Sequence, residues 1–328
     1  MPLNVLKVKI YVPQETINLF GSPEESNGSV LRGAVLIKAC KATKIHLLTI
    51  GFDGWTTSNG PLASRAFGKS KKSLISSQMS LLEPEGSPRH LHKGIHSFPF
   101  EFAIDGMSLE TVRTRYFKTK YFLTAHVKRP KFPVITSACE VPLNRLPLEI
   151  PLGETGFISI QENWESYIKY KIQSNKNTYH VDDFITLNYT FRPLLDSLEV
   201  STIYHYLVEY VTYYKQKSGP STTKERTILL RTCQINHRLE GESFVLTRPE
   251  YIPSPQPDVE NEHVQIKHKL HMVFVLKCGD IQNSMTVTTP IHLINGNESP
   301  GYLPTYQESQ MAGADYVPPP SYHNLVHN

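Results

Sequence analysis

The stretch GIHSFPFEFAI, residues 94–104, is the clearest indication of how this chain folds. Apolar residues occupy every second position in its second half: Phe98, Phe100, Phe102 and Ile104. Successive side chains of a β-strand point to opposite faces of a sheet, so this alternation predicts a strand with one face in a hydrophobic core.

The same period-two alternation recurs in both halves of the chain. Its apolar positions are Leu6, Val8, Ile10 and Val12, then Ile185, Leu187, Tyr189 and Phe191, and finally Leu270, Met272, Phe274 and Leu276. Turn-rich loops such as SPEESNGS and KSGPST join the alternating stretches. No segment has a sustained 3.6-residue period with helix caps, although residues 66–82 are ambiguous and could hold one short helix. We therefore expect an all-β chain of antiparallel, immunoglobulin-like sandwiches.

A chain of 328 residues with 39% hydrophobic content is long enough for two domains, each with its own core. Three prolines and two glycines fall within VPLNRLPLEIPLGETG, between alternating segments, which is typical of a linker. We expect an N-terminal sandwich at 1–147, a linker at 148–156 and a C-terminal sandwich at 157–295. Residues 296–328 are rich in Pro, Gly, Ser, Gln, Asn and Tyr, which predicts a disordered tail.

Composition and cysteine spacing argue against several classes of protein. A formal charge of +4 is too small to indicate nucleic-acid binding through bulk charge. Cys40, Cys139, Cys233 and Cys278 lie far apart without C-x-x-C spacing, so we expect buried free thiols in a reducing compartment. No apolar run approaches the ~18 residues that span a bilayer, and we expect a cytoplasmic protein.

The chain also lacks the sequence motifs of enzymes. It contains no G-x-S-x-G, no phosphate-binding glycine loop and no H-E-x-x-H. His90 and His92 have no further ligand at metal-binding spacing, and Asp182 with Asp183 is typical of a turn before a strand. We expect no catalytic residue, no metal, no cofactor and no small-molecule substrate.

The tail carries a PPxY sequence, PPSY at 319–322, and a degenerate upstream copy, LPTY at 303–306. Proline pre-organises an extended backbone that docks into aromatic-lined grooves, and WW domains bind PPxY in this way. With 24 Pro and 17 Tyr in the chain, roughly 0.1 PPxY matches are expected by chance. We expect WW-domain binding through Pro319, Pro320 and Tyr322, with a weaker and still open contribution from Leu303, Pro304 and Tyr306.

Taken in order, these segments resemble the alpha-arrestin family of arrestin-fold trafficking adaptors. SVLRGAVLIKACKATKIHLLTIGFDGW is similar to the family's opening hairpin, with Gly33 at the start of one strand and Gly54 closing the next. GIHSFPFEFAI and YFLTAHVKRP are similar to the next strands of the family's N-terminal domain. The C-terminal arrestin domain has similar strands to YHVDDFITLNYTFRP, LEVSTIYHYLVEYVTY and VQIKHKLHMVFVL. The resemblance covers both expected domains in the right order.

The resemblance implies an adaptor that recruits a ligase to cargo. The arrestin domains would engage a membrane transporter or receptor, while the tail recruits a WW-domain HECT-type ubiquitin ligase. Cargo would then be ubiquitinated, endocytosed and sorted, with the adaptor recruited to plasma membrane, endosomes or Golgi. The alternative is an arrestin-fold coat or sorting scaffold, similar to the retromer component, or a signalling scaffold, that acts without a ligase.

The longest run of single-sign charge lies between residues 113 and 131. If Tyr121, Leu123, Ala125 and Val127 face the core, the alternate positions of the strand place basic side chains on its outer face. Such a face suits an anionic lipid surface or an acidic segment of cargo, although a solvated strand face is the simpler interpretation. The basic residues of this run are Arg113, Arg115, Lys118, Lys120, Lys128, Arg129 and Lys131.

Lysine placement limits where the chain itself can be ubiquitinated. Lys277 is its last Lys or Arg, so a ligase docked on the tail cannot modify a tail side chain. By nearness in sequence alone, we expect Lys267, Lys269 and Lys277 to be the candidate acceptors.

Overall fold

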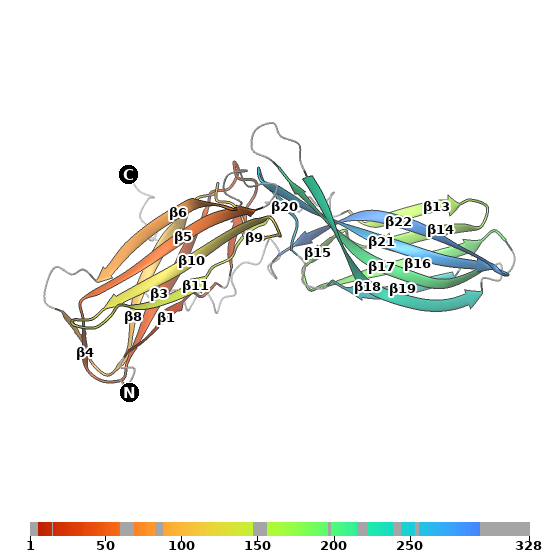
Figure 1. Ribbon diagram of the computed structural model, residues 1–328. Coiled ribbons are helices and arrows are strands. Elements are labelled where there is room, and N and C mark those ends of the chain that lie inside the picture. The colour runs from red at the N-terminus through yellow and green to blue at the C-terminus, as the bar shows by residue number, and fades with distance from the viewer. Residues whose placement is uncertain are drawn as a thin grey trace, which may run out of the picture. The chain divides into compact units, whose positions relative to one another are not determined.

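The structure is a computed structural model. It describes residues 6–14, 16–59, 69–82, 88–146, 156–195, 198–214, 222–238, 244–252 and 256–295. Within these ranges the chain forms strands β1 to β22 and no helix (Figure 1), which confirms the all-β prediction. Residues 66–82, where a short helix was a possible alternative, contain the strand β6 (Lys69–Leu82). This strand pairs with its neighbour β5 along its whole length.

Two antiparallel sheets form the N-terminal sandwich. The first has the order β1 (Leu6–Tyr11), β3 (Ser29–Ala39), β8 (Gly94–Ile104). The second has the order β11 (Ile135–Glu140), β10 (Phe117–Lys128), β5 (Leu47–Asn59), β6, with β9 (Val112–Arg113) paired to β10. Two short pairs complete it: β12 (Leu143–Leu146) lies parallel to β2 (Ile17–Phe20), and β4 (Thr43–Ile45) pairs with β7 (Arg89–Leu91).

The core of the N-terminal sandwich lies between its two sheets. The alternating apolar residues of β8, from Phe98 to Ile104, are buried as predicted. From the opposite sheet, the Phe52 ring lies 5.9 Å from Phe102 and 5.8 Å from Tyr121. Each fully buried side chain of this size stabilises the fold by about 1.5–3 kcal/mol, so this interlocked set is a main source of stability.

Two glycines allow close packing inside strands of this sandwich. A Cβ at Gly33 would lie 2.5 Å from the carbonyl oxygen of Tyr11 and 2.6 Å from the Phe100 ring. A Cβ at Gly54 would meet the ring of Tyr121. Both glycines lie within their strands, β3 and β5, and not at strand ends as the resemblance suggested. Their role is to leave space for neighbouring atoms.

The C-terminal sandwich also consists of two sheets. One has the order β13 (Ile158–Trp164), β14 (Ile168–Ser174), β16 (Phe184–Pro193), β19 (Phe244–Tyr251). The other has the order β15 (Thr178–His180), β22 (Ile281–Ile294), β21 (Val264–Cys278), β17 (Leu198–Tyr213), β18 (Thr222–Arg238), with β20 (Val259–Glu260) paired to β21.

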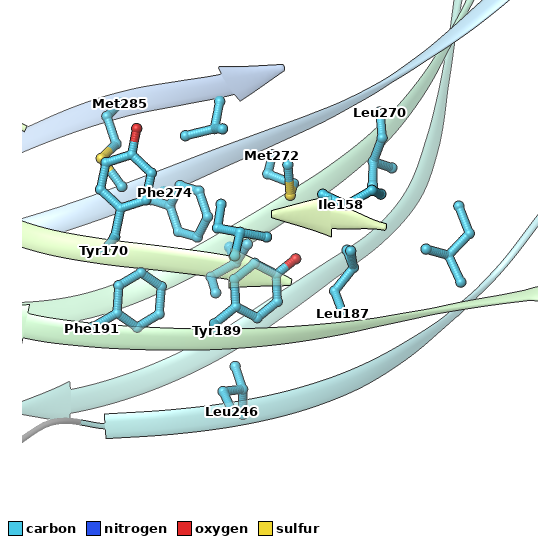
Figure 2. Close-up of a cluster of buried hydrophobic side chains, with 14 of the residues drawn as sticks. Ile158, Tyr170, Leu187, Tyr189, Phe191, Leu246, Leu270, Met272, Phe274 and Met285 are labelled. Atoms are coloured by element: carbon cyan, nitrogen blue, oxygen red, sulfur yellow. The ribbon is translucent and has the colours of Figure 1, made fainter. Parts of the chain in front are cut away.

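Aromatic residues from both sheets meet in the C-terminal core (Figure 2). The Phe274 ring lies edge-on to Tyr189 and Phe191, at centroid distances of 5.7 and 5.4 Å. The hydroxyl group of Tyr189 lies 2.6 Å from Nε2 of His205, and both side chains are fully buried. The predicted alternation of residues 185–191 and 270–276 is therefore confirmed, with every apolar position inside.

The predicted domain boundaries stay a prediction. Separate hydrophobic cores form from residues 6–143 and 158–293, but the expected linker at 148–156 lies outside the described residues except for Gly156. Residues 1–295 form one compact unit, and 296–328 form a second that lies outside the described residues.

The expectation of buried cysteines was wrong where it can be compared. Cys40 is exposed because it follows the last residue of β3, and Cys139 and Cys278 are half-buried. The thiols of Cys40 and Cys139 are free, whereas the side chain of Cys233 lies outside the described residues.

Candidate interaction surfaces

Strand β10 divides the predicted basic run into two groups. Arg113 and Arg115 lie in the β9–β10 hairpin, just before Lys118 and Lys120, whereas Lys128, Arg129 and Lys131 lie at the other end of the strand. The eight steps from residue 120 to residue 128 extend about 26 Å along a strand. Tyr121, Leu123, Ala125 and Val127 face the core as expected. The run therefore contributes to two surfaces instead of one.

At the first of these surfaces a carboxylate neutralises much of the charge. Glu140 on β11 lies opposite Phe122 of β10 in the register. Its two oxygens lie 2.7 Å from Nη2 of Arg113 and 3.5 Å from Nζ of Lys120. The sequence analysis did not include Glu140, because the pairing of β10 with β11 brings it there from outside the basic run.

An aromatic pair occupies the outer face of the same sheet. The rings of Trp55 and Phe122 stack with centroids 5.0 Å apart and planes inclined by 5°. The ammonium group of Lys71 lies 4.0 Å from the centre of the Trp55 ring, and that of Lys120 lies 5.8 Å from Phe122. This cluster joins three strands, β10, β5 and β6, so no local sequence signal marks it.

The β9–β10 hairpin also forms part of the wall of a cavity of about 730 Å³. Strands β17 and β18 of the C-terminal sandwich supply another part of its lining. Its charged lining residues are Arg113, Arg115, Lys224 and Arg226, against Glu209 and Glu225. Positive charges are in excess, so an anionic group is the ligand that this cavity suits best.

Apolar contacts link the two sandwiches beside this cavity. Val112 and Phe117 of the N-terminal sandwich share a small hydrophobic cluster with Val211, Tyr213 and Ile266. The Tyr116 ring also lies edge-on to Tyr213, at 5.4 Å. The tyrosine-rich stretch of β17 is thus partly a contact between the two sandwiches.

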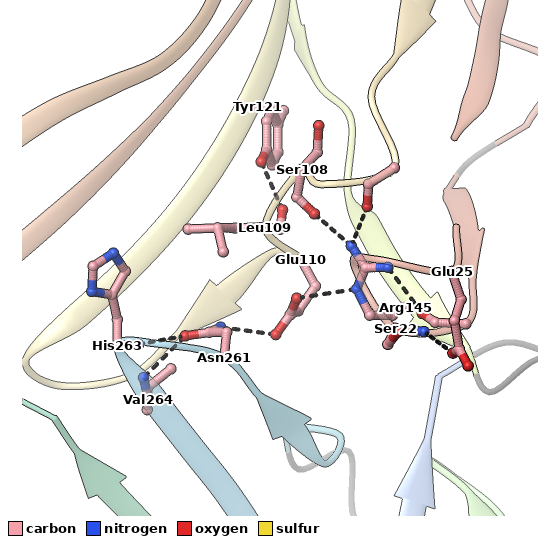
Figure 3. Close-up of polar contacts among 12 residues, drawn as sticks. Ser22, Glu25, Ser108, Leu109, Glu110, Tyr121, Arg145, Asn261, His263 and Val264 are labelled. Carbon is pink, nitrogen blue, oxygen red and sulfur yellow. Dashed lines mark hydrogen bonds and ion pairs between the residues drawn. The ribbon is translucent and has the colours of Figure 1, made fainter. Parts of the chain in front are cut away.

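A buried polar network lies next to the apolar cluster (Figure 3). The guanidinium group of Arg145 donates hydrogen bonds to the carbonyl oxygens of Gly21, Gly106 and Ser108 at 2.8–2.9 Å. Its Nε lies 3.8 Å from a carboxylate oxygen of Glu110, and both side chains are nearly buried. From the other sandwich, the amide of Asn261 donates a hydrogen bond of 2.8 Å to Glu110. This network ties several loops of the N-terminal sandwich to β20–β21.

A second polar cluster surrounds His268, which is 1% exposed on β21. Its Nδ1 lies 2.6 Å from Asp258, and its Nε2 lies 3.7 Å from Glu209. Burial alone lowers the pKa of His268, but the contacts with the Asp258 and Glu209 carboxylates outweigh burial and raise the pKa above its ordinary value. The other oxygen of Asp258 lies 3.2 Å from Nδ1 of His292.

The predicted ubiquitin acceptors lie on β21 and differ in place. Lys267 and Lys269 are exposed, whereas Lys277 is half-buried at the far end of the strand, opposite Gln282 of β22. In the same register, Ile291 lies opposite His268, and beyond this pair β20 takes the place of β22 beside β21. Asn295, the last described residue before the tail, comes four residues after Ile291, whereas it is about 43 Å along the strand from Gln282, the partner of Lys277.

The WW-binding residues expected in the tail, Leu303, Pro304, Tyr306, Pro319, Pro320 and Tyr322, all lie outside the described residues. In the described part of the chain no helix is long and apolar enough to cross a membrane. The same residues contain no group of three or more His, Cys, Asp or Glu that could hold a metal ion.

Comparison with known proteins relates the chain to arrestins. A family model described as arrestin (or S-antigen), C-terminal domain, matches residues 164–297. A Schizosaccharomyces pombe protein, provisionally named an arrestin-related trafficking adapter, is 20% identical over 351 residues, which cover 86% of this chain and 53% of that protein. An arrestin domain-containing protein of the same organism is 20% identical over 290 residues, which cover 83% of this chain and 48% of the other. The chain spans about half the length of these relatives.

Proposed function

The chain belongs to the alpha-arrestin family, and we propose that it is a non-enzymatic adaptor between membrane cargo and a HECT-type ubiquitin ligase. The observation that carries this proposal is the PPSY sequence at 319–322, in a lysine-free segment that follows two β-sandwiches. The trafficking name of one relative supports the cargo half of the proposal. WW domains of the ligase bind the tail, and the sandwiches hold a transporter or receptor.

The tail and the sandwiches divide the work of the adaptor. Pro319 and Pro320 supply a pre-organised extended backbone, and Tyr322 supplies the ring that fills the second pocket of a WW domain. The upstream LPTY keeps one proline and the tyrosine, so it binds a second WW domain more weakly. Tyr306 and Tyr322 are 16 residues apart, a span of roughly 20–24 Å for a flexible chain, so tandem WW domains can engage both motifs.

A pull-down with the WW domains of a HECT ligase tests the recruiting motif. Tyr322→Ala should remove most binding, and a Tyr306/Tyr322 double alanine variant should remove the rest. Ser321→Ala is the matched control, because the third position of PPxY makes no required contact, and it should bind like the unmodified chain. Undiminished binding by the double variant would refute WW recruitment.

Proximity labelling in cells tests the adaptor as a whole. The unmodified chain should label a ligase and membrane cargo, whereas Tyr322→Ala should lose the ligase and keep the cargo. If the unmodified chain labels cargo and coat components but never a ligase, the scaffold alternative is the better description.

The adaptor itself presents acceptor lysines to the docked ligase. Lys267 and Lys269 are exposed and lie in the half of β21 that is nearer to Ile294, the last residue of β22. Lys277 is half-buried at the opposite end of the same strand. Of the three candidates, the first two are therefore the preferred sites of adaptor ubiquitination.

A further inference from the structure

The N-terminal sandwich has a strongly basic end, which we call the basic tip. It consists of residues 38–46, 88–95 and 128–134, which include β4 and β7 and lie at the end of the sandwich where β4 is labelled in Figure 1. Hydrogen bonds hold these segments together. The His46 amide donates to the carbonyl oxygen of Lys128 at 2.8 Å, and Ala39 of β3 pairs with Gly94 of β8.

The basic tip gathers cations from three separate parts of the sequence. None of its residues is Asp or Glu, although Glu83 and Glu85 precede Arg89 in the chain outside the described residues. Apart from Arg129, which is half-buried, all its Lys and Arg side chains are exposed. They are Lys38, Lys41, Lys44, Arg89, Lys93, Lys128, Arg129 and Lys131.

Apolar side chains stand exposed among these charges. The β10–β11 loop reads RPKFPV, in which Phe132 is 57% exposed and Val134 is 51% exposed. Its turn is fixed by a left-handed backbone at Lys131, with φ of 62°, and by stacking of the Arg129 guanidinium 4.2 Å from the Phe132 ring. The loop therefore presents Phe132 and Val134 in a defined conformation, directly after the cations Arg129 and Lys131.

The basic tip is also clear of the contacts between the sandwiches. Phe117, at the start of β10, belongs to the inter-sandwich cluster, and Lys128 ends the same strand eleven residues later, about 36 Å away. Two cavities of the described residues lie at the inter-sandwich end, and none of their lining residues belongs to the tip. Because the cations of the tip come from three adjacent segments, a broad, negatively charged surface can contact the whole tip.

We propose that the basic tip binds an anionic lipid bilayer. Phe132 and Val134 enter the interfacial region, and the lysines lie over the headgroups. Basic residues and inserted apolar residues together give the two signals that stable membrane association requires. This inference does not depend on ligase recruitment, since the tail motif contributes nothing to it.

Co-sedimentation of the full chain with phosphatidylcholine vesicles, with and without phosphatidylserine, tests the proposal. Binding should require phosphatidylserine and weaken with salt. A Lys41/Lys93/Lys131→Gln triple variant should lower the partition coefficient about 100-fold, because each basic residue near an anionic surface contributes about fivefold. Lys9/Lys72/Lys169→Gln is the matched control, since it removes the same charge from exposed sites outside the tip and should change binding less than about fivefold.

Phe132→Ser separates insertion from attraction between charges alone. It removes no charge and should lower binding about tenfold, and Phe132→Trp should give a blue-shifted emission only with anionic vesicles. Thermal unfolding of each variant shows that it is folded. Equal losses in the two triple variants would overturn the assignment to the tip. Binding to polyglutamate without binding to vesicles would overturn the choice of a bilayer.

Discussion

Replacing Arg145 by methionine is expected to destabilise the N-terminal sandwich by about 3–5 kcal/mol. The guanidinium group satisfies the carbonyl oxygens of Gly21, Gly106 and Ser108, and it neutralises the Glu110 carboxylate. Side chains of Arg145 and Glu110 are only 13% and 8% exposed, so water cannot replace these contacts without opening the structure. Methionine has similar volume but removes the donor from three carbonyl oxygens and leaves the buried Glu110 carboxylate without its cation, with only the hydrogen bond from Asn261.

The size of this loss is best judged against an exposed pair. Arg32 and Glu101 lie 2.9 Å apart, but their side chains are 70% and 57% exposed. Arg32→Met should therefore cost less than about 1 kcal/mol, although it also removes an arginine from an ion pair. A total stability of 5–15 kcal/mol is usual for a domain, so the loss at Arg145 is a large fraction and that at Arg32 a small one.

Urea unfolding followed by tryptophan fluorescence measures both variants. The chain has two tryptophans, Trp55 in the N-terminal sandwich and Trp164 in the C-terminal one, so a Trp164→Phe background reports the first alone. Arg145→Lys should fall between methionine and arginine, because it keeps the charge and loses the fork of donors. A loss below about 1 kcal/mol in Arg145→Met would refute the reasoning, since the carbonyl oxygens would then be satisfied without the guanidinium.

Three further predictions concern packing, pH and modification. Gly54→Ala should lower stability by about 1–3 kcal/mol through overlap with the Tyr121 ring, whereas Gly51→Ala, whose Cβ would make ordinary contacts, should be far milder in thermal unfolding. The pKa of His268 is raised in the folded state, so its contribution is complete below about pH 6.5 and is lost as pH rises through the folded pKa. Unfolding free energy should thus fall above pH 6.5, and less steeply in Asp258→Asn, whereas equal slopes would contradict this. Mass spectrometry of the ubiquitinated adaptor should find Lys267 or Lys269 before Lys277, and the reverse order would refute the geometric argument.

The pattern of apolar residues was sufficient to predict the strands, but the sequence was not sufficient to predict the charge of the surfaces. The alternation from Phe98 to Ile104 predicts a half-buried strand because the signal is local and its period is that of the backbone. Whether one face of a strand is charged depends instead on its neighbours. The register of β10 and β11 places Glu140 opposite Phe122, where its carboxylate neutralises Arg113 and Lys120. This register cannot be predicted from the run of basic residues alone.

The basic tip shows that the sequence also fails to indicate which distant charges the fold brings together. Its cations come from three segments that are separated by whole strands, and each segment alone carries two or three of them. The sequence analysis predicted only three members of the tip, Lys128, Arg129 and Lys131. The other members lie in segments that carry no long run of basic residues. Chain topology collects them, since β3, β8 and β10 begin or end at the same edge of the sandwich.

The last strand has a mechanical consequence. β22 pairs with β21 on one side from Ile281 to Ile291 and, in parallel, with the short β15 on the other, and the tail continues directly from its end. A pull on the tail therefore acts along β22 and loads its hydrogen bonds together in shear, instead of peeling them one at a time. A partner bound to the tail would therefore pull on a strand that is hydrogen-bonded on both sides, and the C-terminal core would stay closed under that load.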